Sequence, residues 1–467
     1  MPETLFAKIW NTHLITESAG VGLVLVDRMF LHERTGGVAL QSLRARKRTV
    51  ASPMQVFATV DHVVDTHPGR NDQVSKSYGF PFIDVTRRET QSAKIRLFDV
   101  ADVHQGIVHV ISPELGIVLP GLTLVCPDSH TGTQGAFGAL AWGIGSTEAE
   151  HALATQTLRV RKPRTMRVRI INLLASDVTA KDLALYLIAT HGSAGAHGAV
   201  VEFSGNAVSA LDLESRMTLC NMATEFAAFA AIIAPDDQTF AYLKDRPYAP
   251  KGRTFDRAVK HWESLHSDPE AHFDREIQID AAAVRPMVTW GTNPEDAIPI
   301  DGLIPKFDAL GQEKSRAAYE RAVLYMGVEP GTSIKGLSIN GAFIGACTNS
   351  RLSDLRRAAR AIDGRHVAPG VRAICVPGST LVKRQAEAEG LDQIFKTAGF
   401  EWRESGCSMC FYAGGEHFGP ADRIISSTNR NFEGRQGPQT RTHLASPETV
   451  AASAIAGYIT ESDRRDR

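Results

Sequence analysis

Residues 339–362, INGAFIGACTNSRLSDLRRAARAI, decide the fold. The apolar run at their start is short and bounded by turn residues, which predicts a buried strand. The apolar residues that follow recur at helical spacing and would form one stripe of an amphipathic helix: Leu352, Leu355, Ala359 and Ile362. Cys347 would end the strand, and Asn349 and Ser350 would form the first turn of the helix. A strand that passes directly into a helix is a building unit of α/β folds.

Short apolar runs bounded by turn residues occur along the rest of the chain. They predict strands in GVGLVLVDRMF (20–30), VFATVDH (56–62), GIVHVISPELG (106–116), LTLVCPDSH (122–130), VRAICVPG (371–378) and DRIISSTNRN (422–431). A helix is expected at about 147–158 with Ser146 as its cap, and another after Thr179, which resembles a capping box with Asp182. The sequence thus predicts a mixed α/β protein.

The character of the chain changes near residue 165, which suggests a domain boundary. Met166, Val168 and Ile170 alternate with basic residues and predict a strand that is exposed on one face. Residues 235–274 are more polar and charged, as expected of a partly helical excursion on the surface.

The composition excludes several classes of protein. The 467 residues include 51 basic and 52 acidic ones, so the net charge is −1, and the chain lacks the broad positive charge of a nucleic-acid binder. No apolar run approaches the roughly 20 residues that span a bilayer, and the N-terminus has no signal-peptide pattern. We therefore expect a cytoplasmic globular protein of two or three domains, without nucleic-acid or membrane partners.

Four polar clusters each follow a predicted strand. They are Asp61-His62, Asp128-Ser129-His130, Cys347-Thr348-Asn349-Ser350 and Asn429-Arg430. Ligands of α/β proteins bind at the carboxyl ends of the strands. The four clusters are therefore expected to converge on one cleft.

The chain has six cysteines, too few for a disulfide scaffold of this length. The pair Cys407 and Cys410 could be a redox dithiol, half of a zinc site, part of an iron–sulfur site, or simply two packed thiols. A redox pair should begin a helix, which the residues after Cys410 disfavour, and a structural zinc site needs four ligands. Cys126, Cys220 and Cys375 are interpreted as packed thiols.

Cys347 changes this assessment because it supplies a third thiolate at the end of a predicted strand. Three cysteine ligands on a [4Fe–4S] cluster leave one iron without a protein ligand, whereas electron-transfer clusters normally have four. An open iron favours Lewis-acid chemistry on a substrate.

Several longer motifs resemble a known family in the same order along the chain. They are Asp61-His62, the DSHT box (128–131) with AFGALAWGIGSTEAEHALATQTL (136–158), GACTNSRLSDLRRAA (345–359), GCSMC (406–410) and STNRNFEGRQGP (427–438). Together they resemble the aconitase superfamily, and within it the large-subunit branch of the isopropylmalate dehydratases.

The resemblance implies three α/β domains, 1–165, 166–300 and 301–467, around one [4Fe–4S] cluster per subunit with an exposed iron. It implies a hydro-lyase that isomerises a small dicarboxylic hydroxy acid by reversible dehydration and rehydration, with isopropylmalate as the leading substrate. The fourth, swivelling domain of such enzymes is carried by a separate small subunit. We therefore expect a small-subunit partner that supplies the catalytic base.

The resemblance also implies roles for individual residues. The cluster cysteines are matched by Cys347, Cys407 and Cys410, and asparagines beside the cluster by Asn349 and Asn429. Catalytic groups are matched by Asp61, His62, His109, Asp128, His130 and Glu225. Substrate-binding groups are matched by Ser129, Asn221, Arg430 and Arg435. His109 is expected inside a strand.

The chain departs from the isopropylmalate branch at segments expected to line the substrate pocket. Residues 34–37 read Arg-Thr-Gly-Gly instead of Thr-Ser-Pro-Gln, and residues 411–414 read Phe-Tyr-Ala-Gly instead of Leu-Gly/Ala-Met-Asn. A related acid, such as citramalate/citraconate, dimethylmalate or homocitrate, is therefore an alternative substrate.

Other interpretations stay open. A zinc-bound scaffold could use the same cysteines, and an RNA-binding apo-protein is disfavoured by the balanced charge. The basic run Arg44-Ala45-Arg46-Lys47-Arg48 is interpreted as solvated surface, with partner contact or steering of an anionic substrate as the alternative.

Overall fold

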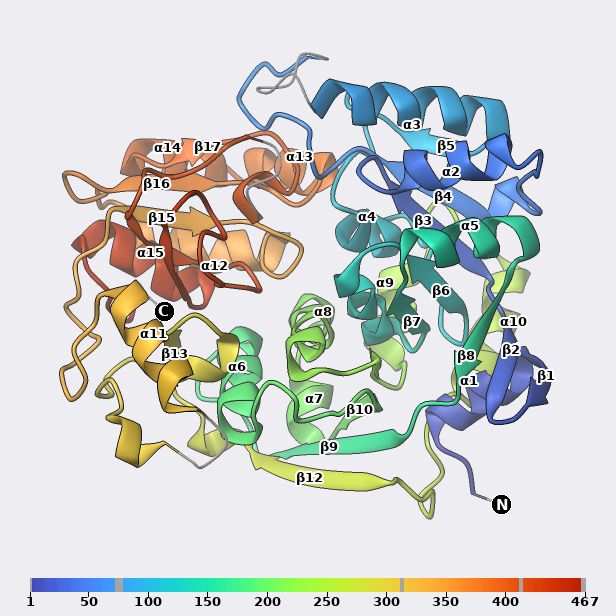
Figure 1. Cartoon of the computed structure of the whole chain (residues 1–467), viewed down its shortest axis with the longest axis horizontal. Helices are drawn as coiled ribbons and strands as arrows, with labels where there is room; N and C mark the ends of the chain where they lie inside the picture. Colours follow the sequence, from blue (N-terminus) through green and yellow to red (C-terminus); the bar gives the residue numbers. More distant parts are fainter. Residues whose placement is uncertain (1, 72–78, 311–314, 411–414, 463–467) are drawn as a thin grey trace. The chain divides into compact units, whose positions relative to one another are not determined.

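The computed structural model describes residues 2–71, 79–310, 315–410 and 415–462 (Figure 1). They form two compact units, each described by itself. Unit 1 comprises Met1–Val64, Asn71–Leu173 and Ala194–Ala281, and unit 2 comprises Asp65–Arg70, Leu174–Ser193 and Ala282–Arg467. Larger parallel sheets lie within residues 28–143, 165–280 and 341–444. The three domain boundaries expected from the sequence stay a prediction.

The first sheet of unit 1 is wholly parallel, with the strand order β5-β4-β3-β6-β7. Its strands are β3 (Arg28–His32), β4 (Val56–Thr59), β5 (Arg96–Phe98), β6 (Thr123–Cys126) and β7 (Leu140–Gly143). The order reverses between β3 and β6, and this is the point where open α/β sheets bind ligands. Helices α3 (Gly79–Ala93) and α5 (Ser146–Thr155) pack against α2 (Gly36–Ala45).

The second sheet of unit 1 has the order β11-β10-β9-β12 and is also parallel. Its strands are β9 (Thr165–Ile171), β10 (Val200–Ser204), β11 (Ala230–Ile232) and β12 (Arg275–Asp280). Met166, Val168 and Ile170 of β9 are buried while the residues between them are at least partly exposed, which confirms the predicted one-sided strand. A third, antiparallel sheet joins β1 (Leu14–Ser18), β2 (Val21–Leu25) and β8 (Thr157–Arg161).

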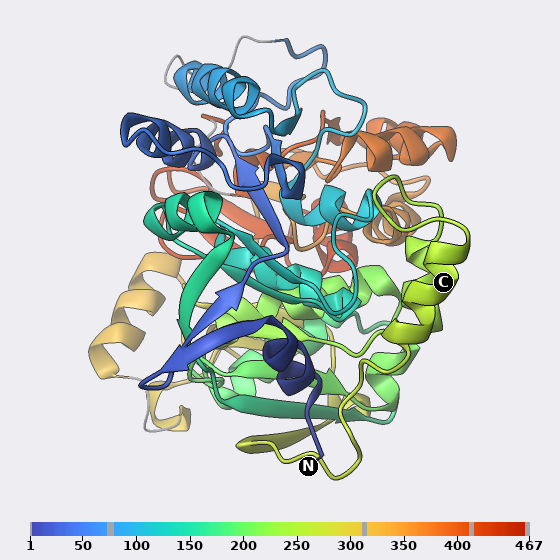
Figure 2. The same cartoon turned by 90° about the vertical axis from the view of Figure 1, so that its right-hand side faces the viewer.

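The remaining elements of unit 1 are helical. They are α1 (Leu5–His13), α4 (Val108–Glu114), α7 (Asn206–Ala210), α8 (Leu213–Met222), α9 (Asp237–Leu243), α10 (Arg253–Trp262) and the 3₁₀ segments η1 (Pro53–Gln55), η2 (Ser129–Phe137) and η3 (Ala223–Phe226). Helices α9 and α10 confirm that the polar stretch 235–274 is partly helical, and α10, yellow-green in Figure 2, buries only Trp262 among its residues.

Unit 2 is built on a parallel sheet with the order β17-β16-β15-β18-β19. Its strands are β15 (Gly341–Ile344), β16 (Arg372–Cys375), β17 (Glu401–Trp402), β18 (Arg423–Ser426) and β19 (Arg441–Leu444). Its helices are α6 (Ala180–His191), α11 (Arg316–Met326), α12 (Leu352–Ile362), α13 (Thr380–Ala388), α14 (Leu391–Ala398) and α15 (Pro447–Ala456). An antiparallel pair, β13 (Met287–Thr289) and β14 (Ala297–Pro299), completes its strands within the described residues.

Three helix starts can be compared with the capping signals in the sequence. The capping box of Thr179 and Asp182 at the start of α6 is present, as predicted. Helix α12 begins at Leu352 and not at Asn349, because the Asp354 carboxylate accepts the N–H of Arg351 at 3.1 Å and caps the helix there. Similarly, Gly145 and not Ser146 caps α5, which ends at Thr155.

Residues 106–116 were predicted to be a strand, and this prediction is wrong. They contain helix α4, whose residues are all buried. Val108, Ile111 and Leu115 recur at helical spacing and join a core cluster with residues of the first sheet. A short apolar run does not by itself distinguish a strand from a buried helix.

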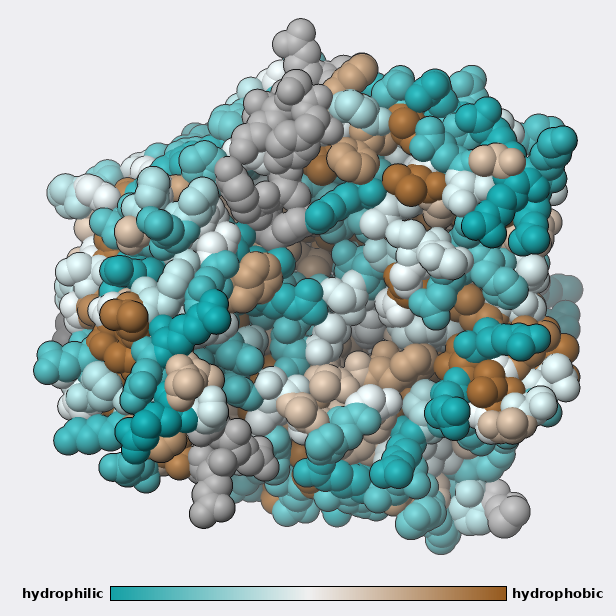
Figure 3. Space-filling model, viewed as in Figure 1, coloured by the Kyte–Doolittle hydropathy of each residue, from teal (hydrophilic) through white to brown (hydrophobic). Residues whose placement is uncertain are grey.

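The surface carries the balanced charge seen in the composition. The face shown in Figure 3 is largely hydrophilic, and apolar residues are scattered over it singly or in small groups. Arg44 pairs with Glu89 and Arg46 with Glu150 while both arginine side chains stay more than half exposed, in agreement with solvated surface. In the described part of the chain, the helices fall short of the length and apolar character that crossing a bilayer requires.

Close packing explains the glycines that replace the usual residues after Glu33. A Cβ atom on Gly36 would lie 2.7 Å from the Cβ of Leu31, and one on Gly37 would lie 2.8 Å from the hydroxyl oxygen of Thr86. The other departure, at residues 411–414, lies outside the described residues.

Gly135 provides a test of the packing of η2 against β11. A Cβ atom there would lie 1.7 Å from the carbonyl oxygen of Ala231, a backbone atom that has no room to move. We expect Gly135→Ala to destabilise the protein by more than about 4 kcal/mol, measured by thermal denaturation. Gly145→Ala is the control, since its Cβ would meet only the Glu148 carboxylate at 3.7 Å, and a loss of about 1 kcal/mol or less is expected. Equal effects of the two changes would contradict this packing.

Candidate active site

The candidate catalytic residues of unit 1 gather at the carboxyl edge of its first sheet. Asp61 and His62 follow β4, and Asp128 follows β6 and caps η2. His109 comes from α4 and Glu225 from η3. Segments that are far apart in the sequence thus supply one group of side chains, as the interpretation of the strand ends predicted.

Three histidine–carboxylate pairs form within this group. The Nδ1 atom of His62 lies 2.6 Å from an Asp61 carboxylate oxygen. The Nε2 atom of His109 lies 2.8 Å from Asp128 Oδ1, and that of His130 lies 2.9 Å from Glu225 Oε1. A carboxylate that bonds to one ring nitrogen of a histidine fixes the orientation and tautomer of the ring, which suits each pair for proton transfer.

Asp128 connects the pairs to one another. Besides its bond to His109, its second carboxylate oxygen lies 3.2 Å from His62 Nε2, and it accepts the backbone N–H of His130 at 2.7 Å. Burial opposes ionisation of Asp128, but the charge and hydrogen bond of His109, followed by those of His62, hold its pKa well below the usual range. Asp128 is therefore a carboxylate at neutral pH.

Asp61 is fully buried and is oriented from two sides. Its second oxygen accepts the N–H of Val108 at the start of α4 at 3.0 Å, while the first is bonded to His62. Burial would raise the pKa of Asp61, but the charge of His62 and its hydrogen bond outweigh that effect and lower the pKa. Helix α4 thus positions His109 and the Asp61 carboxylate together.

Glu33, at the end of β3, is a member of the site that sequence reasoning missed. Its buried carboxylate accepts the N–H groups of Asp61, His62 and Val63 at 3.0, 2.7 and 2.5 Å. Burial and the neighbouring charge of Asp61 raise its pKa to about 7. The only available signal was a polar pair, His32-Glu33, directly after an apolar strand.

His32, the other half of that pair, stacks on the ring of His62 with 4.0 Å between the ring centroids. Its Nε2 atom lies 3.1 Å from the carbonyl oxygen of Pro127. Burial and the charge of His62 lower its pKa to about 4, so His32 is neutral at pH 7 and adds no positive charge beside His62.

Asn221 and Ser129 support His130. The Asn221 amide donates to the hydroxyl of Thr133 at 2.8 Å, and that hydroxyl donates to the His130 carbonyl at 2.6 Å. The Ser129 hydroxyl lies 3.3 Å from His130 Nδ1. The structure therefore places both residues with the histidine group, and their predicted contact with substrate stays a prediction.

The second group of candidate residues lies in unit 2, around the buried Cys347 and Cys410. The Asn429 amide lies 3.5 Å from the Cys347 sulfur, and the Arg435 guanidinium lies 3.5 Å from the Cys410 sulfur. Arg435 also lies 3.5 Å from the Asn429 side-chain oxygen. Cys407 is also buried and lies one 3₁₀ turn before Cys410. The Cys410 N–H donates to the Cys407 carbonyl at 2.8 Å.

The loop that carries Cys347 is held by buried polar groups. Arg351 donates to the carbonyls of Cys347 and Thr348 at 2.6 and 2.8 Å. The Asn349 amide donates to Asp354 at 3.0 Å, which places Asn349 in the loop before α12, and its predicted position beside the cluster stays a prediction. Arg430, next to Asn429, is partly buried and directly precedes the turn to Arg435.

The donor set around these cysteines fits a [4Fe–4S] cluster. N–H groups of Asn429 and Arg435 are directed at sulfur atoms, an arrangement that stabilises thiolates and cluster sulfurs. In contrast, burial raises the pKa of the thiols of Cys126, Cys220 and Cys375, which keeps these thiols protonated. The division of the cysteines into three candidate ligands and three packed thiols is therefore physically consistent.

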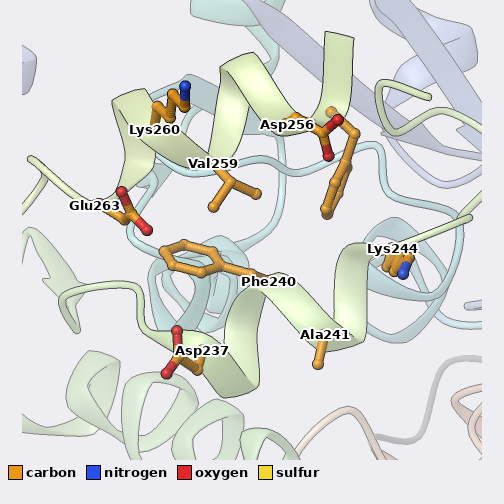
Figure 4. A pocket seen from close by; sticks show the side chains of 9 residues that line it. Asp237, Phe240, Ala241, Lys244, Asp256, Val259, Lys260 and Glu263 are labelled. Atoms are coloured by element: carbon orange, nitrogen blue, oxygen red, sulfur yellow. The ribbon is translucent and has the colours of Figure 1, made fainter. Parts of the chain in front are cut away.

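An open hollow of about 460 Å³ lies elsewhere, between α9 and α10 (Figure 4). Phe240 and Val259 point into it, and charged side chains such as Asp237 and Lys260 surround it. No candidate catalytic residue lines it, so it is not part of the site described above. The convergence of the two residue groups on one cleft stays a prediction.

The raised pKa of Glu33 has a consequence for stability. Between its ordinary value of 4.5 and about 7, the folded protein binds more protons than the unfolded chain, so stability is lost as the pH rises through this range. We expect the free energy of unfolding of the wild type to fall by about 3 kcal/mol relative to Glu33→Gln between pH 4.5 and above pH 7, measured by urea unfolding. Substitution of the exposed Glu17 by Gln controls for the removal of a carboxylate. Parallel pH profiles of wild type and Glu33→Gln would refute the assignment.

Comparisons with known proteins identify the family of the chain. The model of the aconitase family (aconitate hydratase) matches residues 7–457. Among solved structures, the chain is similar to the holo-form of aconitase X from Thermococcus kodakaraensis, with 11% sequence identity, a TM-score of 0.46, and coverage of 95% of this chain and 89% of that one. The family match extends over nearly the whole chain and confirms the resemblance found in the sequence. The chain therefore belongs to the aconitase family, which indicates a hydro-lyase.

Proposed function

We propose that this chain is the large subunit of a 3-isopropylmalate dehydratase, which interconverts 2-isopropylmalate and 3-isopropylmalate by dehydration and rehydration through 2-isopropylmaleate in leucine biosynthesis. The observation that carries the proposal is the pairing of two features within one aconitase-family chain. One is the set of three buried cysteines, with N–H groups directed at the sulfurs of Cys347 and Cys410, and the other is the set of three histidine–carboxylate pairs.

The reaction removes a proton next to a carboxylate and expels hydroxide, which is a poor leaving group. A [4Fe–4S] cluster held by Cys347, Cys407 and Cys410 would supply Lewis-acid chemistry at its open iron. The histidine pairs supply the proton transfers: His62, held by Asp61, is the proposed acid for the leaving hydroxyl. His130, held by Glu225 at 2.9 Å, is suited to exchange a proton with the water that is released or added.

The two arginines of the NRNFEGR segment have different proposed tasks. Arg435 is buried and directs one guanidinium nitrogen at Cys410 and Asn429, so it orders the cysteine site. Arg430 is only partly buried and is the better candidate for bidentate binding of a substrate carboxylate.

The base that takes the carbon-bound proton is proposed to come from a small-subunit partner, as in the branch that the sequence resembles. The chain by itself would then bind the cluster but show no isomerase activity. A related acid such as citramalate, dimethylmalate or homocitrate is the second candidate substrate, favoured by the departures at residues 34–37 and 411–414.

The substrate assignment is tested with the chain purified without oxygen and combined with its small subunit. We expect isomerisation of isopropylmalate to be fastest in a panel that also contains citramalate, dimethylmalate and homocitrate, measured by the absorbance of the alkene intermediate. Activity on only one of the other acids would replace isopropylmalate as the assigned substrate but would leave the assignment as a hydro-lyase in place. A protein without activity on the whole panel would refute the proposed function.

The cysteine assignment predicts that Cys347→Ser abolishes or strongly reduces the brown colour and the content of about four irons per chain. The control is Cys375→Ala, which removes a buried thiol from β16 of the same unit and should keep the wild-type iron content. Iron and sulfide analysis of both variants, with zinc measured in parallel, checks the prediction. Zinc near one per chain without iron would favour a zinc-bound scaffold instead.

A further inference from the structure

A short segment, Asp65–Arg70, belongs to unit 2 although the residues on both sides of it belong to unit 1. We refer to this segment as the strap. Only Val63 and Val64 separate it from the catalytic candidate His62, and both are buried in the core of unit 1. The strap is therefore joined to the Asp61-His62 pair by a short, buried stretch of backbone.

The strap is held by one buried carboxylate, that of Glu416, whose side chain is 3% exposed. Glu416 accepts the backbone N–H of Thr66 at 2.9 Å and the Thr66 hydroxyl at 2.7 Å. The same carboxylate accepts the hydroxyl of Ser408, which lies between Cys407 and Cys410. Glu416 thus bridges the strap and the turn from Cys407 to Cys410, which also meet directly where the Thr66 hydroxyl donates to the Ser408 hydroxyl at 3.2 Å.

Further contacts place the strap on the residues before that turn. The Glu404 N–H donates to the Thr66 carbonyl at 2.7 Å, and Arg70 donates to the Ser405 carbonyl at 2.5 Å. The buried guanidinium of Arg403 lies 3.9 Å from Glu416 and offsets its charge. The ligand atoms of Asp65, His67 and Glu416 lie close enough together for a cation site, but both carboxylate oxygens of Glu416 already accept hydrogen bonds from Thr66 and Ser408.

The cysteine turn, Cys407 to Cys410, contains one residue with an unfavourable backbone conformation. Ser408 has a φ of 46°, a left-handed conformation that is unfavourable for a residue with a side chain. Its hydroxyl bond to Glu416 compensates for this conformation, and ligation of the two flanking cysteines would fix the turn in the same geometry.

We propose that Glu416 is a positioning residue that couples ligation of Cys407 and Cys410 to the order of the strap. This inference rests on the proposed cluster site. With the cysteines ligated, Ser408 stays bonded to Glu416, and Glu416 holds Thr66 in place. When the cluster is lost, the turn relaxes, Glu416 is released from Ser408, and the strap, which follows the Asp61-His62 pair in the chain, loosens.

Hydrogen exchange at the Thr66 amide, measured by mass spectrometry on the full chain, tests the coupling. Removing the cluster from the wild type should speed exchange about tenfold. Glu416→Ala, which removes both acceptor oxygens, should exchange fast already when loaded with cluster, and removing the cluster should then change the rate less than twofold. Glu389→Ala, which removes an exposed carboxylate paired with Arg356, should behave as wild type.

A second variant separates the coupling from simple loss of structure. Ser408→Ala removes the bonds of the Ser408 hydroxyl to Glu416 and to Thr66 but keeps the Glu416 carboxylate. Because Glu416 is then released from the cysteine turn in both states, Thr66 should exchange at the fast rate whether or not cluster is bound. If cluster removal leaves the Thr66 exchange of the wild type unchanged, or if Ser408→Ala responds to it as strongly as the wild type, the coupling is overturned. A wild-type chain that binds no iron would instead overturn the proposed function.

Discussion

The negative charge of Asp128, held in a largely buried position between two histidine rings, is the constraint around which the site of unit 1 is arranged. An ionised carboxylate removed from water is costly unless several donors satisfy it. Its donors are His109 Nε2 at 2.8 Å, His62 Nε2 at 3.2 Å and the His130 N–H at 2.7 Å. These donors come from three separate segments, so satisfying one carboxylate requires that α4, the end of β4 and η2 meet. The same carboxylate fixes the orientation of the His62 and His109 rings.

The topology of the sheets explains why such groups assemble twice. The first sheet of unit 1 and the sheet of unit 2 have the same order, in which the first strand lies at the centre and the fourth is placed beside it. A crevice opens at the carboxyl ends of those two strands. In unit 1 it receives Glu33 from the end of β3 and Asp128 from the end of β6. In unit 2 it receives Cys347 after β15 and Asn429 after β18, which accounts for the amide–sulfur contact at 3.5 Å.

The strand ends and the cysteines could be predicted from the sequence because their signals are local. Apolar runs that stop at Asp61, Asp128, Cys347 and Asn429 mark the carboxyl ends of strands whatever the partners of those strands are. The position of His109 could not be predicted, because the same apolar run fits a strand or a helix until its core neighbours are known. Glu33 was missed for a related reason. Its importance lies in three N–H groups almost 30 residues away, which no local pattern reveals.

The buried charges differ between the two groups of candidate residues, although the net charge of the chain is close to zero. Around the cysteines of unit 2, three buried cations donate to carbonyl or sulfur atoms: Lys181, Arg351 and Arg435. Lys181 donates to two carbonyls, those of Ser427 and Thr428, which directly precede Asn429. Buried cations lower the free energy of nearby thiolates and bound anions. In unit 1, by contrast, the buried charges of the site are carboxylates matched by histidines, which suits proton exchange. A net charge of −1 is the sum of such local groups, and therefore a balanced composition excludes a broad nucleic-acid surface but not a local cluster of buried cations.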